Sequence, residues 1–96
     1  MKLILIVCGK QRNKEVVDLL EKHRIQGYTE MPTVLGAGDS GKHMGTRSFP
    51  GTECMLFTLV EKERADGLIH DLKDLHARLY PEEALHAFSL DAESIL

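Results

Sequence analysis

The chain has 96 residues with 43% hydrophobic and 28% charged side chains, a formal net charge of −3 and an isoelectric point near 5.9. This length and composition suit one folded domain, and the acidic balance offers no attraction to phosphate backbones, so nucleic acid is not an expected partner. The N-terminal apolar run is six residues long. Because it is too short for a signal peptide or a membrane span, we expect a cytoplasmic protein.

The first half of the chain predicts a strand, a helix and a second strand. Residues 3–8 (LILIVC) form an apolar run typical of a fully buried strand. Apolar residues at helical spacing predict a helix over about residues 14–24, with Asn13 as its cap. Residues 25–35 predict the second strand, and Pro32, which cannot donate to a ladder, places that strand at a sheet edge or a bulge.

The second half repeats the pattern after a glycine-rich stretch. Residues 53–60 (ECMLFTLV) predict a strand, and residues 84–90 predict another, followed by a helical turn over 92–96 that Asp91 caps. Between these strands, apolar residues recur at spacings of three and four and predict a helix that ends near Pro81. These apolar residues are Ala65, Leu68, Ile69, Leu72, Leu75 and Leu79. The order β-α-β-β-α-β predicts one ferredoxin-like α+β domain over residues 1–96, with a four-stranded antiparallel sheet and both helices on one face.

Two of the predicted strands are apolar at every position, residues 3–8 and 54–57. A sheet with helices on one face only would instead alternate apolar and polar residues. Both faces are therefore expected to be buried, and no residues remain to build a second layer within the chain. We expect a homo-oligomer that packs sheet against sheet.

The stretch VLGAGDSGKHMGTRSFPG (residues 34–51) holds five of the eight glycines and shows no helical or strand period. It matches both GxGxxG and GxxxxGK, but Gly45 and Pro50 oppose the helix that either nucleotide-binding motif requires. Glycine-rich backbone can still expose consecutive N–H groups to an anion, and Lys42 and Arg47 would add positive charge. The segment predicts a long binding loop for a small anionic effector.

Three stretches resemble the PII signal-transduction proteins: residues 25–29 (IQGYT), 34–38 (VLGAG) and 41–43 (GKH). The resemblance implies a ferredoxin-like homotrimer whose loop at about 36–52 corresponds to the T-loop, which reports effector binding to a partner protein such as a transporter or enzyme. It also implies an effector such as ATP, ADP or AMP. By position, Thr29, Gly36 and Gly38 would border the cleft between subunits where PII proteins bind ATP or ADP. With the loop residues Ser40, Lys42 and Arg47 they make up the expected effector-binding set.

The chain also departs from the PII pattern. Residues 78–84 (RLYPEEA) replace the glycine-rich turn with a lysine that follows the second helix in PII proteins. No tyrosine lies between Gly36 and Thr52, so modification of a loop tyrosine is excluded. These departures indicate a PII-like protein rather than a nitrogen regulator in the strict sense.

An alternative function is divalent or soft metal binding, as in the CutA-like proteins that share this topology. The candidate ligands are His43, Cys8 and Cys54. The two cysteines lie at the end of the first strand and the start of the third, which are antiparallel neighbours in this fold, so their sulfurs are expected to be close. A buried thiol pair without a ligand is the plainer interpretation. No arrangement of residues typical of catalysis stands out, and an enzyme is not expected.

Overall fold

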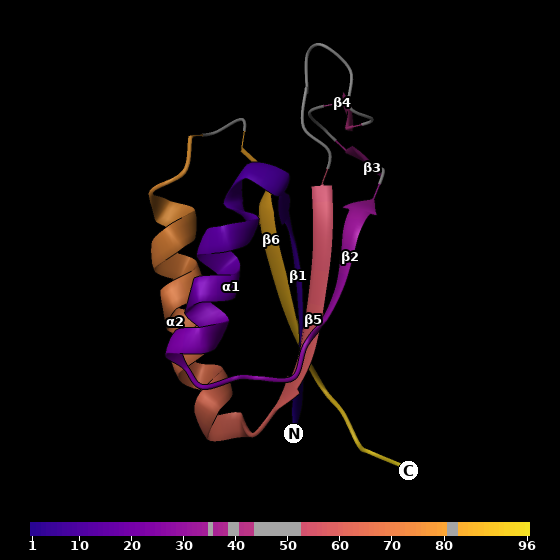
Figure 1. The fold of residues 1–96 in the computed structure, drawn as a ribbon, viewed down its shortest axis with the longest axis vertical. Coiled ribbons are helices and arrows are strands. Elements are labelled where there is room, and N and C mark those ends of the chain that lie inside the picture. Colours follow the sequence, from indigo (N-terminus) through magenta and orange to yellow (C-terminus); the bar gives the residue numbers. More distant parts are fainter. Residues whose placement is uncertain (35, 39–40, 44–52, 81–82) are drawn as a thin grey trace.

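The computed structural model describes residues 1–34, 36–38, 41–43, 53–80 and 83–96. Its elements in chain order are β1 (Lys2–Gly9), the 3-10 helix η1 (Lys10–Arg12), α1 (Asn13–Lys22), β2 (Thr29–Val34), β3 (Gly36–Gly38), β4 (Gly41–His43), β5 (Glu53–Val60), α2 (Lys62–Ala77) and β6 (Leu85–Asp91). The main sheet has the order β2-β5-β1-β6, and all neighbouring strands are antiparallel. Both helices lie on one face of this sheet (Figure 1). The predicted ferredoxin-like α+β fold is confirmed.

The core lies between the two helices and the sheet. Successive strand residues face opposite sides, so alternate residues of β1 and β5 point toward the helices and are fully buried. The helices contribute the apolar stripes that their spacing predicts. The buried apolar residues are Ile4, Ile6, Cys8, Val16, Leu20, Ile25, Cys54, Leu56, Val60, Ala65, Leu68, Leu72, Leu75 and Leu85. Since each buried aliphatic side chain contributes about 1.5–3 kcal/mol, this layer is the main source of stability.

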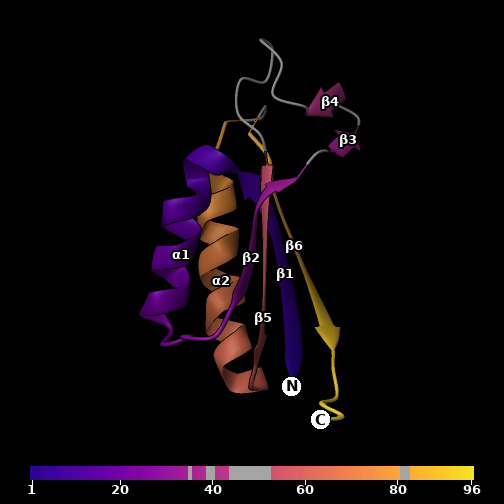
Figure 2. The ribbon, with the colours of Figure 1, turned by 45° about the vertical axis from the view of Figure 1, so that its right-hand side comes forward.

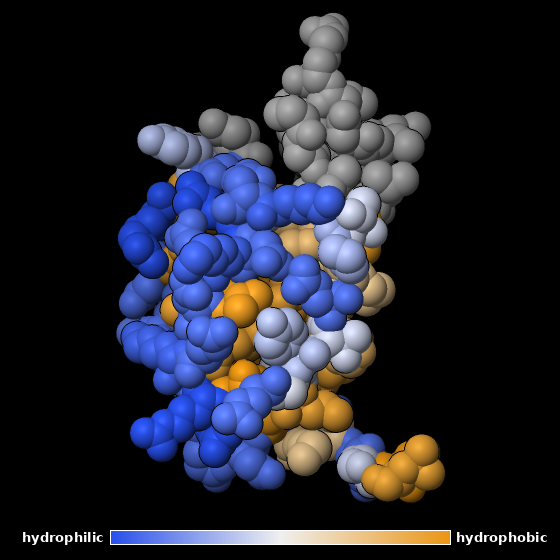
Figure 3. Space-filling model, in the orientation of Figure 1, coloured by the Kyte–Doolittle hydropathy of each residue, from blue (hydrophilic) through white to orange (hydrophobic). Residues whose placement is uncertain are grey.

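No helix of the described chain covers the opposite face of the sheet, which we call the open face (Figure 2). The ladder gives it an apolar grid, because Leu5 pairs with Phe57 on one side and with Phe88 on the other. Its apolar members are Leu3, Leu5, Val7, Met31, Met55, Phe57, Leu59, Phe88 and Leu90. In the isolated chain Phe88 is 56% exposed and Leu90 is 49% exposed. In Figure 3, hydrophilic side chains cover the helices, whereas hydrophobic ones gather toward the strands.

β2 is an edge strand, and its ladder with β5 shifts register between Met31 and Val34. Pro32 lies within this shift, so the predicted edge position and bulge are both confirmed. The strand begins at Thr29, however, and residues 25–28 form a connection instead of the predicted first part of the strand.

Two predicted helix features are wrong. Asn13 is the first residue of α1 rather than its cap, and its side-chain amide donates instead to the Glu30 carboxylate at 3.1 Å. Residues 92–96 form no helical turn. Asp91 is the last residue of β6, and its carboxylate accepts a hydrogen bond from the ammonium of Lys2, its ladder partner, at 2.6 Å. The carboxylate is therefore engaged across the sheet instead of at a helix terminus.

The glycine-rich stretch that shows no helical or strand period in the sequence also contains two short strands, β3 and β4. β3 and β4 pair as a short hairpin beyond the end of β2 (Figures 1 and 2). Glycine occupies three of the six hairpin positions, and because it has no side chain to alternate, the strand period is invisible in the sequence. Within the part of the chain that the structure describes, no helix is long and apolar enough to cross a membrane.

Candidate functional site

Three strand ends meet where the segment between β2 and β5 leaves the main sheet and returns to it. Val34 at the end of β2 pairs with Glu53 at the start of β5, and Gly9 at the end of β1 pairs with Glu53 from the other side. The Gly9 N–H also donates to the carbonyl of Ala84, just before β6, at 3.2 Å. We call the region of Gly9, Val34 and Glu53 the loop end of the sheet. It anchors both ends of the segment on adjacent strands.

The β3–β4 hairpin holds three of the six predicted effector-binding residues. Gly36 and Gly38 lie in β3, and Lys42 lies in β4, where it pairs with Ala37 between the two glycines. Ser40 and Arg47 lie outside the described residues. The structure thus brings two of the predicted glycines and one predicted cation into a single hairpin next to the loop end.

Thr29, the remaining predicted residue, lies at the other end of β2 and is exposed. A strand rises about 3.3 Å per residue, so roughly 17 Å separates Thr29 from Val34. One small anion cannot contact both Thr29 and the hairpin of the same chain. A site for one small anionic group that used both would have to take them from different subunits.

The predicted proximity of the two cysteines is confirmed. Cys8 and Cys54 pair directly across β1 and β5, and their sulfurs lie 3.4 Å apart in the helix-facing layer. Both side chains are fully buried, and both are free thiols. Burial, followed by the hydrogen bond with Cys54, raises the pKa of the Cys8 thiol. The pair therefore lies just inside the loop end, one residue from Gly9 and Glu53.

A small cavity of about 200 Å³ borders this pair on the Cys54 side. Cys54 lines it but Cys8 does not, and Lys10, Asn13 and Glu30 supply its polar groups. The amide nitrogen of Asn13 lies 3.5 Å from the Cys54 sulfur and 3.1 Å from the Glu30 carboxylate, so it bridges the two. No sequence pattern indicates this cavity, because its lining comes from elements that only the fold brings together.

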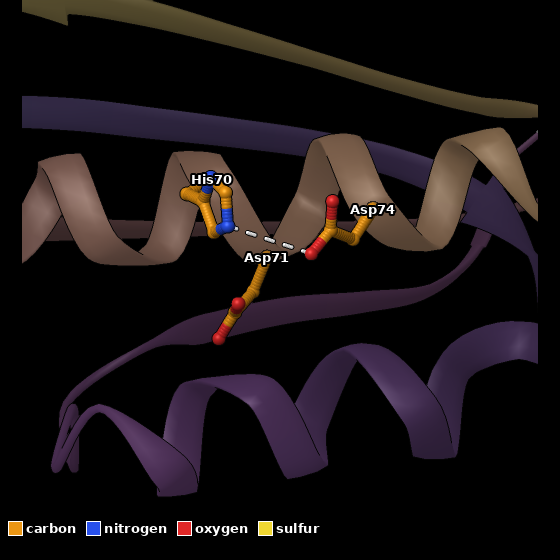
Figure 4. Close-up of side chains that lie close together, drawn as sticks. All are labelled: His70, Asp71 and Asp74. Atoms are coloured by element: carbon orange, nitrogen blue, oxygen red, sulfur yellow. Dashed lines mark ion pairs between the residues drawn. The ribbon is translucent and has the colours of Figure 1, made fainter.

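Among the described residues, one cluster has three metal-ligating side chains within reach of one another: His70, Asp71 and Asp74 on α2 (Figure 4). The spacing of the histidines alone could not reveal it, because two of its members are aspartates. Asp71, however, already accepts hydrogen bonds from Lys22 at 2.9 Å and from His23 at 2.7 Å. These bonds, Lys22 first, lower the pKa of Asp71. We therefore interpret Asp71 as a tether between α1 and α2.

His43, the third predicted metal ligand, has its backbone in β4, outside the strands that carry the cysteines. The structure thus brings together only two of the three candidate ligands, Cys8 and Cys54. A larger cavity of about 370 Å³ lies between α2 and the edge strand β6, lined in part by Leu72, His76 and Phe88. Sequence patterns did not predict it either, since it depends on how the helix crosses the strand.

The sequence matches a known protein family over most of its length. The model of the family described as nitrogen regulatory protein P-II matches residues 1–87. No curated protein sequence matches the chain.

Solved structures show the same fold at low sequence identity. CPII, a nitrogen regulatory PII-like protein from Thiomonas intermedia K12 bound to ADP, AMP and bicarbonate, superposes with a TM-score of 0.73 at 18% identity, covering 93% of this chain and 84% of that one. A proposed PII-like signaling protein from Thermus thermophilus superposes with a TM-score of 0.67 at 22% identity, covering 93% of this chain and 83% of that one. The apo form of CPII gives a TM-score of 0.66 at 15% identity, covering 93% and 87%.

Proposed function

The chain belongs to the nitrogen regulatory protein P-II family, and we propose that it is a homotrimeric, non-catalytic signalling protein of the cytoplasm. Its effector is a small anion, either an adenine nucleotide (ATP, ADP or AMP) or bicarbonate, held in the clefts between subunits. CPII, which has the same fold, is bound to ADP, AMP and bicarbonate. The segment over residues 36–52 acts as the T-loop and reports the effector to a partner protein such as a transporter or enzyme.

The observation that carries this proposal is the open face. Its nine apolar side chains form a continuous grid over the four strands, and the described part of the chain has no further layer to cover it. Large exposed apolar patches on a folded protein mark interfaces. Three chains that pack these faces together would remove the grid from water and create clefts where the edge of one subunit meets the next.

The proposed site combines residues of two subunits. Thr29 of one subunit lies near the edge of its sheet, and Gly36, Gly38 and Lys42 of a neighbour supply backbone N–H groups and one positive charge. Ser40 and Arg47 complete the set. The distance along β2 supports this division, because roughly 17 Å separates Thr29 from the hairpin end of the strand, too far for one phosphate or bicarbonate group to contact both.

The way in which the segment over residues 36–52 is anchored would let it report effector binding to a partner protein. Residues 36–52 leave the sheet at Val34 and re-enter it at Glu53, which are ladder partners. An effector that contacts the hairpin therefore acts directly on a segment with both ends fixed. Ordering one conformation costs on the order of 1 kcal/mol per residue, so a bound ligand that offsets this cost selects the conformation that a partner recognises.

Thermal unfolding with and without ligands tests the proposal. A ligand that binds only the folded protein at a hundredfold excess over its Kd adds about 2.7 kcal/mol of stability, so ATP, ADP, AMP or bicarbonate should raise the Tm. Sulfate at equal ionic strength is the control for nonspecific anion effects. Light scattering on the same sample should give the mass of three chains. A monomer that none of these ligands stabilises would refute the proposal.

A second candidate function, binding of a soft metal, is favoured by the Cys8–Cys54 pair. We place it second because metal binding needs deprotonated sulfurs, whereas burial raises the pKa of Cys8. Two sulfurs also supply only half of the ligands of a structural zinc site. Titration with Ag⁺ or Cu⁺, followed by native mass spectrometry, tests it. Tight binding that Cys8→Ser and Cys54→Ser each abolish would place metal binding first.

A further inference from the structure

Cys8 and Cys54 lie where a disulfide can form with little movement of the backbone. Residues directly opposite in an antiparallel ladder have Cα atoms about 4.5 or 5.5 Å apart, and disulfides accept Cα separations of roughly 4.4–6.8 Å. The sulfurs, now 3.4 Å apart, would have to approach to about 2.05 Å. Rotation of the two side chains and a small local shift can provide this change.

The surroundings of the two sulfurs differ. Cys54 borders the cavity of about 200 Å³ at the loop end and Cys8 does not, but both side chains are 0% exposed, so an oxidant reaches the Cys54 sulfur only when the cavity wall opens locally. The Asn13 amide contacts the Cys54 sulfur at 3.5 Å, and Lys10 lines the same cavity. Glu30 also lines this cavity, and its carboxylate accepts a hydrogen bond from the same Asn13 amide.

We propose that Cys8 and Cys54 form a reversible dithiol–disulfide site, in which a small oxidant enters the cavity and reacts with Cys54, and Cys8 then resolves the product. The oxidant class is a hydroperoxide, with hydrogen peroxide as the smallest member. The proposal gives the two cysteines different roles. If they served only to pack the core, they would be expected to react alike.

The first step forms one bond and breaks another. The thiolate of Cys54 attacks one oxygen of hydrogen peroxide, so that an S–O bond forms, the O–O bond breaks, and hydroxide leaves. Cys54 is then a sulfenic acid. The proton that Cys54 lost on forming the thiolate converts the hydroxide to water.

In the second step the Cys8 sulfur attacks the Cys54 sulfur. The S–S bond forms, the S–O bond breaks, and the hydroxyl leaves with the Cys8 proton as a second water. Together the two steps oxidise two thiols by two electrons and reduce one peroxide to two waters. Burial keeps the proton on Cys8 until this step, since it raises the pKa of that thiol.

The position of the pair gives the bond a consequence, which rests on the proposed function. Cys8 precedes Gly9 and Cys54 follows Glu53, and these neighbours form the loop end with Val34. A covalent bond there fixes β1 to β5 beside the point where the segment over residues 36–52 returns to the sheet. Oxidation would therefore change how tightly the base of that segment is held.

The test follows the thiols and needs no effector, so its outcome is independent of the proposed function. The wild-type protein is exposed to hydrogen peroxide under native conditions, and its peptides are analysed by mass spectrometry. We expect an intramolecular Cys8–Cys54 disulfide that a dithiol reductant reverses. In Cys8→Ser, dimedone should trap a sulfenic acid at Cys54, whereas in Cys54→Ser the remaining Cys8 should react at least tenfold more slowly.

Controls separate this reactivity from simple exposure. In denaturant the two single-cysteine variants should react at similar rates, which shows that the native difference comes from the fold. Circular dichroism verifies that each variant is folded, and the wild-type disulfide measurement stands even where a variant is not. Native wild-type thiols that stay reduced while denatured protein is oxidised, or a Cys8 that reacts as fast as Cys54, would overturn the proposal.

Discussion

Leu5 of β1 lies directly opposite Phe57 of β5 on the open face of the sheet. The next residues along these strands, Ile6 and Leu56, also pair, but they face the helices and are at most 1% exposed. One step along the strand thus separates a position in the apolar grid from a position in the core. Substitutions at Leu5 and Leu56 can therefore distinguish assembly from folding.

We expect Leu5→Glu to yield a folded monomer and Leu56→Glu to prevent folding. A charge at Leu5 can reach water once the subunits separate, whereas at Leu56 it would be buried without a partner, at a cost of several kcal/mol. The milder Leu56→Ala should lower the free energy of unfolding by about 2–5 kcal/mol. Light scattering measures the mass, and circular dichroism measures the folding. A Leu5→Glu protein with the wild-type mass would show that the open face is not the interface.

The apolar runs were enough to predict the strands of the core, because their composition alone identifies β1 and β5. They could not show which residues of each run face the helices, since register depends on the neighbouring strand. The pairing of Cys8 with Cys54 could be anticipated because topology made their strands neighbours. The cavity beside Cys54 could not, because Asn13 and Glu30 reach it from other elements.

The connection before β2 shows why its start was missed. Arg24 adopts a left-handed conformation with φ of 59°, where glycine or asparagine is more usual, so the sequence carried no stop signal there. Its carbonyl accepts a hydrogen bond from the Arg64 guanidinium. The Thr58 hydroxyl donates to the carbonyl of Gly27. These contacts from side chains distant in sequence hold residues 25–28 as a connection. Although their composition favours a strand, they do not pair with β5, and β2 begins only at Thr29.

Gly67 on α2 leaves room for the His23 ring. A Cβ at position 67 would lie 2.9 Å from His23 Cε1, closer than two nonbonded carbon atoms can approach. His23 would have to shift and weaken its 2.7 Å bond to Asp71. We expect Gly67→Ala to destabilise the protein, although alanine is about 1 kcal/mol better than glycine within a helix.

The control for this effect is the same substitution in a His23→Ala background. There the clash is removed, so Gly67→Ala should stabilise the protein by up to about 1 kcal/mol. Urea unfolding of the four proteins measures both effects in one cycle. If Gly67→Ala has the same effect in both backgrounds, the ring of His23 is not the cause.

Glu83 links the turn before β6 to the start of α1. Its carboxylate accepts two hydrogen bonds from the Arg12 guanidinium, at 2.9 and 3.0 Å, and one from the Tyr80 N–H at 2.9 Å. The Tyr80 bond is the first cause that lowers the pKa of Glu83, followed by Arg12. Because the folded pKa lies below the unfolded one, this contribution to stability is present above the unfolded pKa and is lost as pH falls through the folded pKa.

Glu83→Gln should therefore lower the free energy of unfolding at neutral pH. The difference from wild type should shrink below about pH 4.3, the unperturbed pKa of a glutamate. Asp18→Asn is the matched control, since Asp18 pairs with Lys14 in an exposed ion pair that contributes little. Urea unfolding at several pH values measures both. Equal effects of the two substitutions at neutral pH would contradict the assigned role of Glu83.

The proposed effector site can be tested at the hairpin. Gly38→Val adds a branched side chain where the proposed backbone donors approach the anion, so it should abolish effector binding and leave the trimer intact. Lys42→Ala and Arg47→Ala each remove one charged contact, which is worth about 1.5–3 kcal/mol, or roughly ten- to hundredfold in Kd. The loss of affinity should be largest at low salt. At high salt, ions screen the charges of Lys42 and Arg47, so these side chains contribute less to binding in the wild type.

Lys14→Ala serves as the control, because it removes an equal charge from the exposed surface of α1. Calorimetric titration with ADP and with bicarbonate at two salt concentrations measures Kd for each protein, and light scattering verifies the trimer. The result expected is an unchanged Kd for Lys14→Ala and a salt-dependent increase for Lys42→Ala and Arg47→Ala. If Gly38→Val binds the effector as tightly as the wild type does, the anion does not contact β3, and the segment over residues 36–52 has another role.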